Sequence, residues 1–141
     1  MRLDEDDARA RLAGQVHGVL CTLHPRRGPD PQPVVYAVSD GHVGVPIDTV
    51  KPKSSARLQR EANLEADPRA SLLVEHWELE DWSRLWWVRA ELSHVADPGP
   101  ALLDDLAFRL ARAVPQYVDR PFHRILVCRI VGVTGWAAVG D

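Results

Sequence analysis

Residues 32–47 read QPVVYAVSDGHVGVPI, and this stretch decides how the rest of the chain is interpreted. Residues 32–38 and 42–47 contain several valines with tyrosine and isoleucine, residue types that are enriched in β-strands. Between them lies Ser39-Asp40-Gly41, in which the Asp-Gly pair is a strong signal for a tight turn between antiparallel strands. The stretch therefore predicts a β-hairpin.

The segments around this hairpin extend the pattern. Residues 17–24 (HGVLCTLH) have the composition of a strand and residues 25–31 (PRRGPDP) that of a turn, so three consecutive antiparallel strands are expected. Further strands are predicted at 70–77, 83–95 and 122–139, the last with a bend at Gly132 or Gly135. Helical spacing of apolar residues predicts helices at 3–15, 54–65 and 100–113.

The order of these elements predicts the fold class. Neighbouring strands mostly lack the helical crossovers that a parallel sheet requires. We therefore expect a mainly β protein, an antiparallel β-barrel with flanking helices, in which residues 1–141 form a single domain.

Composition and charge exclude several classes of protein. The net charge of −3 argues against a general nucleic-acid binder, which carries a basic excess. The longest apolar run, at 124–139, is interrupted and falls short of the ~20 residues that span a bilayer. The first residues, MRLDEDDARARL, lack the features of an export signal. Cys21 and Cys128 lie in apolar stretches, as buried free thiols do, and we expect a cytoplasmic location without a membrane partner.

Common enzyme motifs are missing from the sequence. There is no nucleophile elbow, Walker loop or dinucleotide fingerprint. His17, Cys21 and His24 resemble metal ligands in their spacing, but on a strand His24 points away from the face that His17 and Cys21 share. No metal site is therefore expected.

The strongest chemical signal is residues 48–58, DTVKPKSSARL, which contain both lysines of the chain, Lys51 and Lys53. Ser54 or Ser55 can cap the helix expected to follow, and Arg57 would then lie in its first turn. Positive side chains at the positive end of a helix dipole are unfavourable unless an anion binds there. The segment predicts a phosphate site; the alternative is an ordinary capped helix beside solvated lysines.

A second signal is residues 82–92, WSRLWWVRAEL. Strand alternation separates two faces. The inward face comprises Trp82, Trp86, Val88, Ala90 and Leu92, and the outward face comprises Leu85, Trp87, Arg89 and Glu91. An indole beside a guanidinium suits either a dimer interface or the wall of a site for a flat, anionic aromatic cofactor.

An ordered set of short motifs covers nearly the whole chain: residues 18–22 (GVLCT), 32–36 (QPVVY), 44–49 (GVPIDT), 53–58 (KSSARL) and 63–70 (NLEADPRA). This set resembles the pyridoxamine 5'-phosphate oxidase-like, flavin/deazaflavin split-barrel proteins. Within that group, residues 45–53 (VPIDTVKPK) and 83–89 (SRLWWVR) resemble a subfamily assigned to the deazaflavin coenzyme F420. The resemblance implies a homodimer of six-stranded antiparallel Greek-key split barrels, with a cofactor in each of two clefts between the subunits.

The resemblance also implies which residues hold the cofactor. Lys53 and Ser54, with Lys51 or Arg57 nearby, would bind its phosphate. The ring would be lined by two strand segments, Pro33, Val34 and Val35 in the first and Ile47, Asp48 and Thr49 in the second. Trp87 and Arg89 would form part of the wall.

The implied function is that of an F420-dependent oxidoreductase, which transfers a hydride between the deazaflavin and a small organic electron acceptor. The cofactor carries such chemistry, so no catalytic side chain is required. Two alternatives stay open: an FMN-dependent oxidoreductase, and a non-catalytic module that stores flavin or haem. A cleft packed shut by Trp87 or Trp136 would favour storage. Pyridoxamine phosphate oxidation is disfavoured because no second basic cluster is evident.

Overall fold

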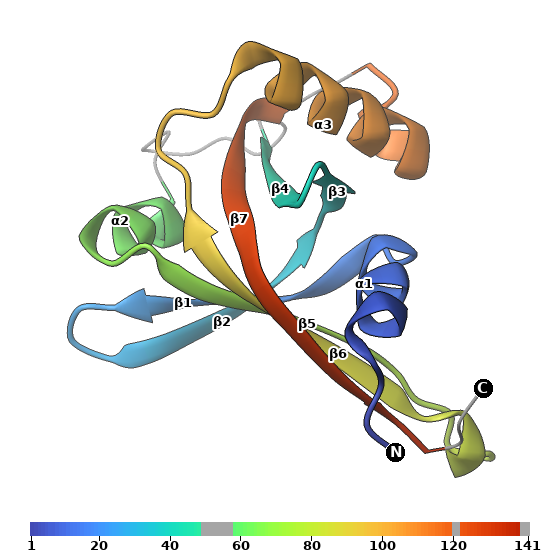
Figure 1. Ribbon diagram of the computed structural model, residues 1–141. Coiled ribbons are helices and arrows are strands. Elements are labelled where there is room, and N and C mark those ends of the chain that lie inside the picture. The colour runs from blue at the N-terminus through green and yellow to red at the C-terminus, as the bar shows by residue number, and fades with distance from the viewer. Residues whose placement is uncertain (49–57, 120–121, 139–141) are drawn as a thin grey trace.

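Seven strands form one antiparallel sheet in the computed structural model, which describes residues 1–48, 58–119 and 122–138 (Figure 1). The strands are β1 (His17–His24), β2 (Gly28–Val35), β3 (Ala37–Ser39), β4 (His42–Asp48), β5 (Arg69–His76), β6 (Trp86–His94) and β7 (Phe122–Ala137). The helices are α1 (Glu5–Ala13), α2 (Gln59–Ala66) and α3 (Pro100–Ala113), with 3-10 turns η1 (Trp82–Arg84) and η2 (Pro115–Tyr117). The predicted mainly β class, antiparallel pairing and flanking helices are confirmed.

The number of strands differs from the six expected, because residues 32–38 do not form one continuous strand. The sheet order is β2-β1-β5-β6-β7-β4-β3, so β2 and β3 are its two edges although Tyr36 alone separates them in the sequence. The N–H of Tyr36 donates to the Val16 carbonyl at 3.0 Å, and its buried hydroxyl donates to the Leu12 carbonyl at 2.5 Å. Residues 28–39 thus contribute a strand to each edge of the sheet, and this requires the sheet to curl.

β2 begins earlier than expected, at Gly28, and the prediction of a turn over residues 25–31 is wrong beyond Arg27. The prolines at 29, 31 and 33 suggested a turn, but they alternate along an edge strand and point outward. Proline is tolerated on an edge strand, where its missing N–H breaks no ladder. Asp30, Gln32 and Val34 consequently share the opposite, more buried face.

Two other sequence features behave as expected. The tight turn at Asp40-Gly41 is confirmed, with both residues at positive φ (48° and 71°). In β7 the pairing with β6 shifts register: Leu92 faces Ile130 and Glu91 faces Gly132, so Val131 is an extra residue in β7. The long strand therefore has an irregularity beside Gly132, where a bend was predicted.

The core lies inside the curled sheet. Val88, Ala90 and Leu92 of β6 are buried, which confirms the predicted inward face for these residues. Trp82 is a correction: β6 begins only at Trp86, and Trp82 lies in η1, 64% exposed. Asp81 caps η1 by accepting the N–H of Ser83, which stops the strand from starting earlier. Further core residues include Leu20, Val43, Leu64, Leu72 and Cys128.

The helices lie around the sheet (Figure 1). α1 starts at Glu5, two residues later than predicted, because Asp4 caps it by accepting the N–H of Asp7, and three acids occupy its first turn. α3 buries Leu106 and Leu110 against Ala37 and Val127. Among the described residues no helix has both the length and the apolar character needed to cross a membrane.

Candidate functional site

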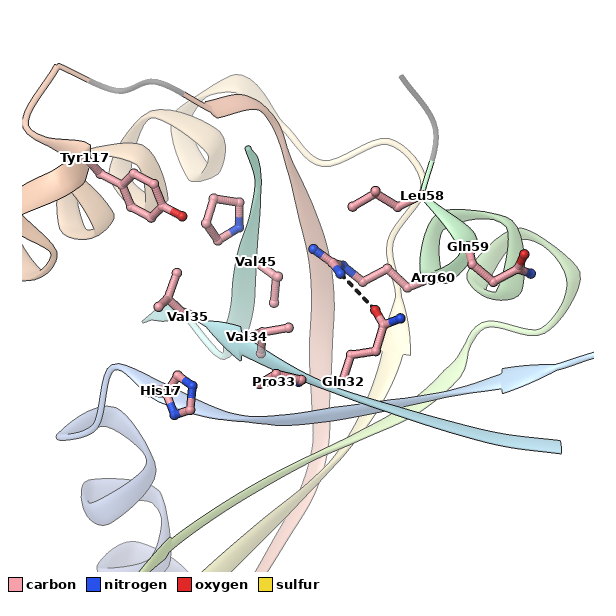
Figure 2. A pocket seen from close by; sticks show the side chains of 11 residues that line it. His17, Gln32, Pro33, Val34, Val35, Val45, Leu58, Gln59, Arg60 and Tyr117 are labelled. Atoms are coloured by element: carbon pink, nitrogen blue, oxygen red, sulfur yellow. Dashed lines mark hydrogen bonds between the residues drawn. The ribbon is translucent and has the colours of Figure 1, made fainter. Parts of the chain in front are cut away.

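A pocket of ≈ 460 Å³ opens between the start of α2 and strands β1, β2 and β4 (Figure 2). Its lining combines an apolar wall of strand residues with polar side chains from the helices. The lining residues are His17, Gln32, Pro33, Val34, Val35, Val45, Pro46, Leu58, Gln59, Arg60 and Tyr117.

The apolar wall includes part of the predicted ring site. Pro33, Val34 and Val35 of β2 line the pocket, and their predicted contact with a cofactor ring stays a prediction. Ile47 does not line it; its side chain is 2% exposed and packs in the core, while Val45 and Pro46 take the place next to β2. An apolar wall of this kind suits contact with one face of a planar ring.

Arg60 dominates the polar side of the pocket. Figure 2 shows its side chain reaching from α2 over Val34 and Val45, opposite Tyr117. Its Nη1 donates to Oε1 of Gln32 at 2.9 Å, and its Nε is buried without a hydrogen-bond partner among the described residues. Burial lowers the pKa of the Arg60 guanidinium, although a guanidinium keeps its charge in proteins. The pocket thus contains a half-buried cation with one donor, Nε, that has no partner in the part of the chain that the structure describes.

The neighbouring acid, Glu61, opposes this pKa shift of Arg60 through its charge, but its carboxylate is hydrogen-bonded elsewhere. Its carboxylate forms a bidentate pair with Arg124 of β7, at 2.9 Å from Arg124 Nε and 2.7 Å from Nη2. Oε1 of Glu61 also accepts the backbone N–H of Leu58 at 3.1 Å. Glu61 therefore ties the start of α2 to β7, and the neutral side chain of Gln32 accepts the hydrogen bond from Arg60.

The start of α2 corrects one premise of the phosphate prediction. The helix begins at Gln59 with Leu58 as its N-cap, and not near Ser54. Its first turn contains an acid, Glu61, and Arg57 lies before that turn. The predicted phosphate ligands themselves, Lys51, Lys53, Ser54 and Arg57, lie outside the described residues, as do Thr49 and the side chain of Asp48.

Trp87 and Arg89 lie away from this pocket. They line a shallower depression of ≈ 290 Å³ on the outside of the sheet, together with Arg2, Thr134, Gly135 and Trp136. The Arg89 guanidinium carbon lies 5.6 Å from the centre of the Trp87 ring, and Arg89 Nε lies 3.0 Å from a carboxylate oxygen of Glu91. Within one chain, therefore, neither these two residues nor Trp136 lines or covers the larger pocket.

Groups that hold metals do not come together in the described ranges, where no three of the His, Cys, Asp and Glu side chains converge. Both cysteines are free thiols. Cys128 is buried, which raises the pKa of its thiol to about 12, whereas Cys21 is only half-buried.

The sequence reasoning missed Arg60, Tyr117 and His17 as pocket residues. A signal for Arg60 was present, because it lies four residues before Leu64, a predicted core position, and residues at this spacing share a helix face. Tyr117 and His17 gave no such signal. They meet in the pocket through the curling of the sheet.

Neither a protein-family model nor a curated protein matches this sequence. Solved structures do match. A conserved hypothetical protein from Mycobacterium tuberculosis is 22% identical over 99% of this chain and 93% of its own, with a TM-score of 0.74. A heme binding protein from Mycobacterium smegmatis is 19% identical over 97% of this chain and 55% of its own (TM-score 0.72). A FAD-binding protein from Mesorhizobium loti is 18% identical over 96% and 93% (TM-score 0.65).

Other matching structures are a second FAD-binding protein, from Mycobacterium smegmatis, a heme storage protein from Vibrio cholerae and a putative pyridoxamine 5'-phosphate oxidase from Corynebacterium glutamicum, at 13%, 14% and 16% identity. At these identities the likeness concerns the fold. The fold of this chain is therefore one shared by flavin-binding, heme-binding and pyridoxamine phosphate oxidase-like proteins, in agreement with the split-barrel resemblance of its motifs.

Proposed function

We propose that this chain is an oxidoreductase that binds coenzyme F420, or FMN in its place, in the pocket beside α2. The observation that carries this proposal is Arg60, a half-buried guanidinium beside the apolar wall of the pocket, whose Nε has no hydrogen-bond partner among the residues that the structure describes. Burial lowers the pKa of this guanidinium in spite of the opposing charge of Glu61, so an anion bound in the pocket would stabilise the cation further. A phosphorylated flavin or deazaflavin offers both a ring for the wall and an oxyanion for Arg60.

Each part of the pocket would then have a task. Pro33, Val34 and Val35 would pack against the ring and exclude water from one of its faces. Arg60 would donate two hydrogen bonds to an oxyanion of the cofactor. Gln32, by accepting from Nη1, would hold the guanidinium in place before the ligand arrives. When bound, a flavin or deazaflavin supplies the hydride transfer, here to a small organic acceptor.

The proposal predicts a contribution from the segment that precedes α2. From its position in the sequence, Lys53 would add a second cation for the cofactor phosphate. Lys53→Ala is expected to weaken F420 or FMN binding at least tenfold, or about 1.4 kcal/mol, in a fluorescence titration. Arg26→Ala, an exposed residue in the β1–β2 turn, serves as the charge-matched control. Unchanged affinity in the Lys53 variant would remove this residue from the site.

We also propose that the chain acts as a homodimer through the outside of its sheet. Leu73, Val131 and Trp136 are 41%, 55% and 36% exposed there, and Trp87 pairs with Trp136 across β6 and β7. An aromatic and aliphatic face with an arginine is typical of protein interfaces. Light scattering at micromolar concentration should give a dimer, and Trp136→Glu should shift it to a monomer. A monomeric wild-type protein would contradict this interface.

Native mass measurement after competition between F420, FMN and haem tests the function directly. One F420 or FMN per chain supports the proposal, and oxidation of the bound, reduced cofactor by an added quinone would assign an enzyme. Haem bound in preference to both flavins would favour storage, for which His17 in the pocket is a candidate iron ligand. Binding of none of the three would refute a cofactor site here.

A further inference from the structure

Asn63 is the most completely buried polar side chain near the pocket, with 0% exposure, yet it does not line the pocket. Its Nδ2 donates to Thr22 Oγ1 of β1 at 2.9 Å and to Asp30 Oδ2 of β2 at 3.0 Å. Its Oδ1 accepts from Nε2 of Gln59 at 2.8 Å. The amide thus uses both donor hydrogens and its acceptor, and it joins α2 to two strands.

Among the described residues, two side-chain hydrogen bonds connect α2 to β2, and their spacing on the helix matches their spacing on the strand. Asp30 and Gln32 are two residues apart on β2 and share its inner face. Asn63 and Arg60 are three residues apart on α2, so they lie one above the other on the helix. The inner bond is Asn63–Asp30 and the outer bond is Arg60–Gln32. Together with the Glu61–Arg124 pair at the start of α2, the inner bond therefore favours the alignment in which the outer bond forms.

Apolar packing alone does not fix this alignment. Leu64 is 1% exposed and holds α2 on the sheet, but apolar contact has no preferred direction. The hydrogen bonds of a buried amide do have a preferred direction, and leaving a buried donor or acceptor without a partner is unfavourable. They restrict rotation of α2 about its axis, and that rotation would swing Arg60 away from the apolar wall.

We infer that Asn63 is a positioning residue: it fixes α2 so that the Arg60 guanidinium points at the oxyanion of the bound cofactor. This inference rests on the proposed function for the identity of the ligand. It concerns a residue outside the pocket. Through its effect on Arg60, the Asn63 amide would set the preference of the site for a flavin or deazaflavin that carries a phosphate over one that carries none.

The first measurement needs no cofactor. In the free protein, the NMR resonance of the Arg60 Nε–H, assigned by its loss in Arg60→Gln, reports the surroundings of that side chain. Asn63→Leu is expected to shift or broaden it. The matched control is Ser39→Ala, which removes a strand-to-helix hydrogen bond to Asp105 on α3, away from the pocket. The control should leave the Arg60 resonance in place.

The second measurement separates positioning from stability. The ratio of the dissociation constants for riboflavin and FMN reports recognition of the phosphate, since the two ligands share one ring. For F420, its phosphate-free deazaflavin chromophore serves in the same way. Asn63→Leu should lower this ratio at least fivefold, and adding Arg60→Gln should lower it little further. Ser39→Ala should lower the melting temperature and keep the ratio.

The outcomes are distinct. An unchanged Arg60 resonance or an unchanged ratio in Asn63→Leu overturns the inference, even if the variant is less stable. If Asn63→Leu does not fold, Asp30→Ala, which removes the same bond from the other side, carries both measurements. A wild-type protein that binds no flavin but whose Arg60 resonance moves in the variant would refute the proposed function and keep the positioning role.

Discussion

Arg60→Gln is expected to weaken binding of F420 or FMN about thirtyfold, the equivalent of about 2 kcal/mol for a lost charge-assisted hydrogen-bond pair. The glutamine is uncharged, and it cannot offer the paired N–H groups of a guanidinium to an oxyanion. The loss should be confined to phosphorylated ligands, so riboflavin should bind with nearly unchanged affinity. Fluorescence titration with both ligands measures this.

Two further variants make that result specific. Arg60→Lys keeps the charge but loses the fork of the guanidinium, and should fall between wild type and Arg60→Gln. Arg9→Gln removes a partly exposed arginine that pairs with Glu5 on α1 and does not line the pocket, and this variant should bind as wild type does. Equal losses for FMN and riboflavin in Arg60→Gln would show that Arg60 supports the shape of the pocket instead of an anion.

Leu72→Ala is expected to lower the free energy of unfolding by about 3 kcal/mol, which is typical for removing a fully buried leucine and leaving a cavity. Leu72 is 0% exposed and lies at the centre of the sheet, where it pairs with Leu20 on one side and Ala90 on the other. Urea unfolding measures the change. Leu79→Ala, at a residue 69% exposed, should change it by less than ~0.5 kcal/mol. A similar, small effect at both positions would contradict the assigned core.

Much of the sheet could be predicted from local signals. β1 has the bounds that its composition indicated, the Asp40-Gly41 turn has the positive φ angles that such a turn requires, and the inward face of β6 follows strand alternation. These features depend on residues close together in the sequence. The alternation of apolar residues along a strand and the residue types in a turn are enough to predict these features.

Other parts depend on contacts between distant segments. The break at Tyr36 exists because Leu12 of α1 and Val16, in the segment that follows this helix, supply the partners of Tyr36, which a valine-rich run does not reveal. The later start of α2 reflects Glu61, held by Arg124, a residue 63 positions away. Pattern reasoning placed the helix four or five residues too early because good helix formers continue before Gln59.

The candidate site was predicted in part for the same reason. The resemblance of the motifs predicted a cofactor site at Pro33, Val34 and Val35, and the three residues do line a pocket. Arg60 could not, since its importance comes from what surrounds it: a neutral partner, a buried Nε and an acid already paired with Arg124. Whether Lys53 and Trp87 contribute stays a prediction.

The alternating prolines of β2 have a consequence for the behaviour of the protein at high concentration. An exposed edge strand can recruit a strand from another molecule, which starts aggregation. At residues 29, 31 and 33 this edge has no amide hydrogen to offer, so an incoming chain finds an interrupted row of donors. We expect these prolines, which led to the prediction of a turn, to keep the folded protein from forming intermolecular sheets.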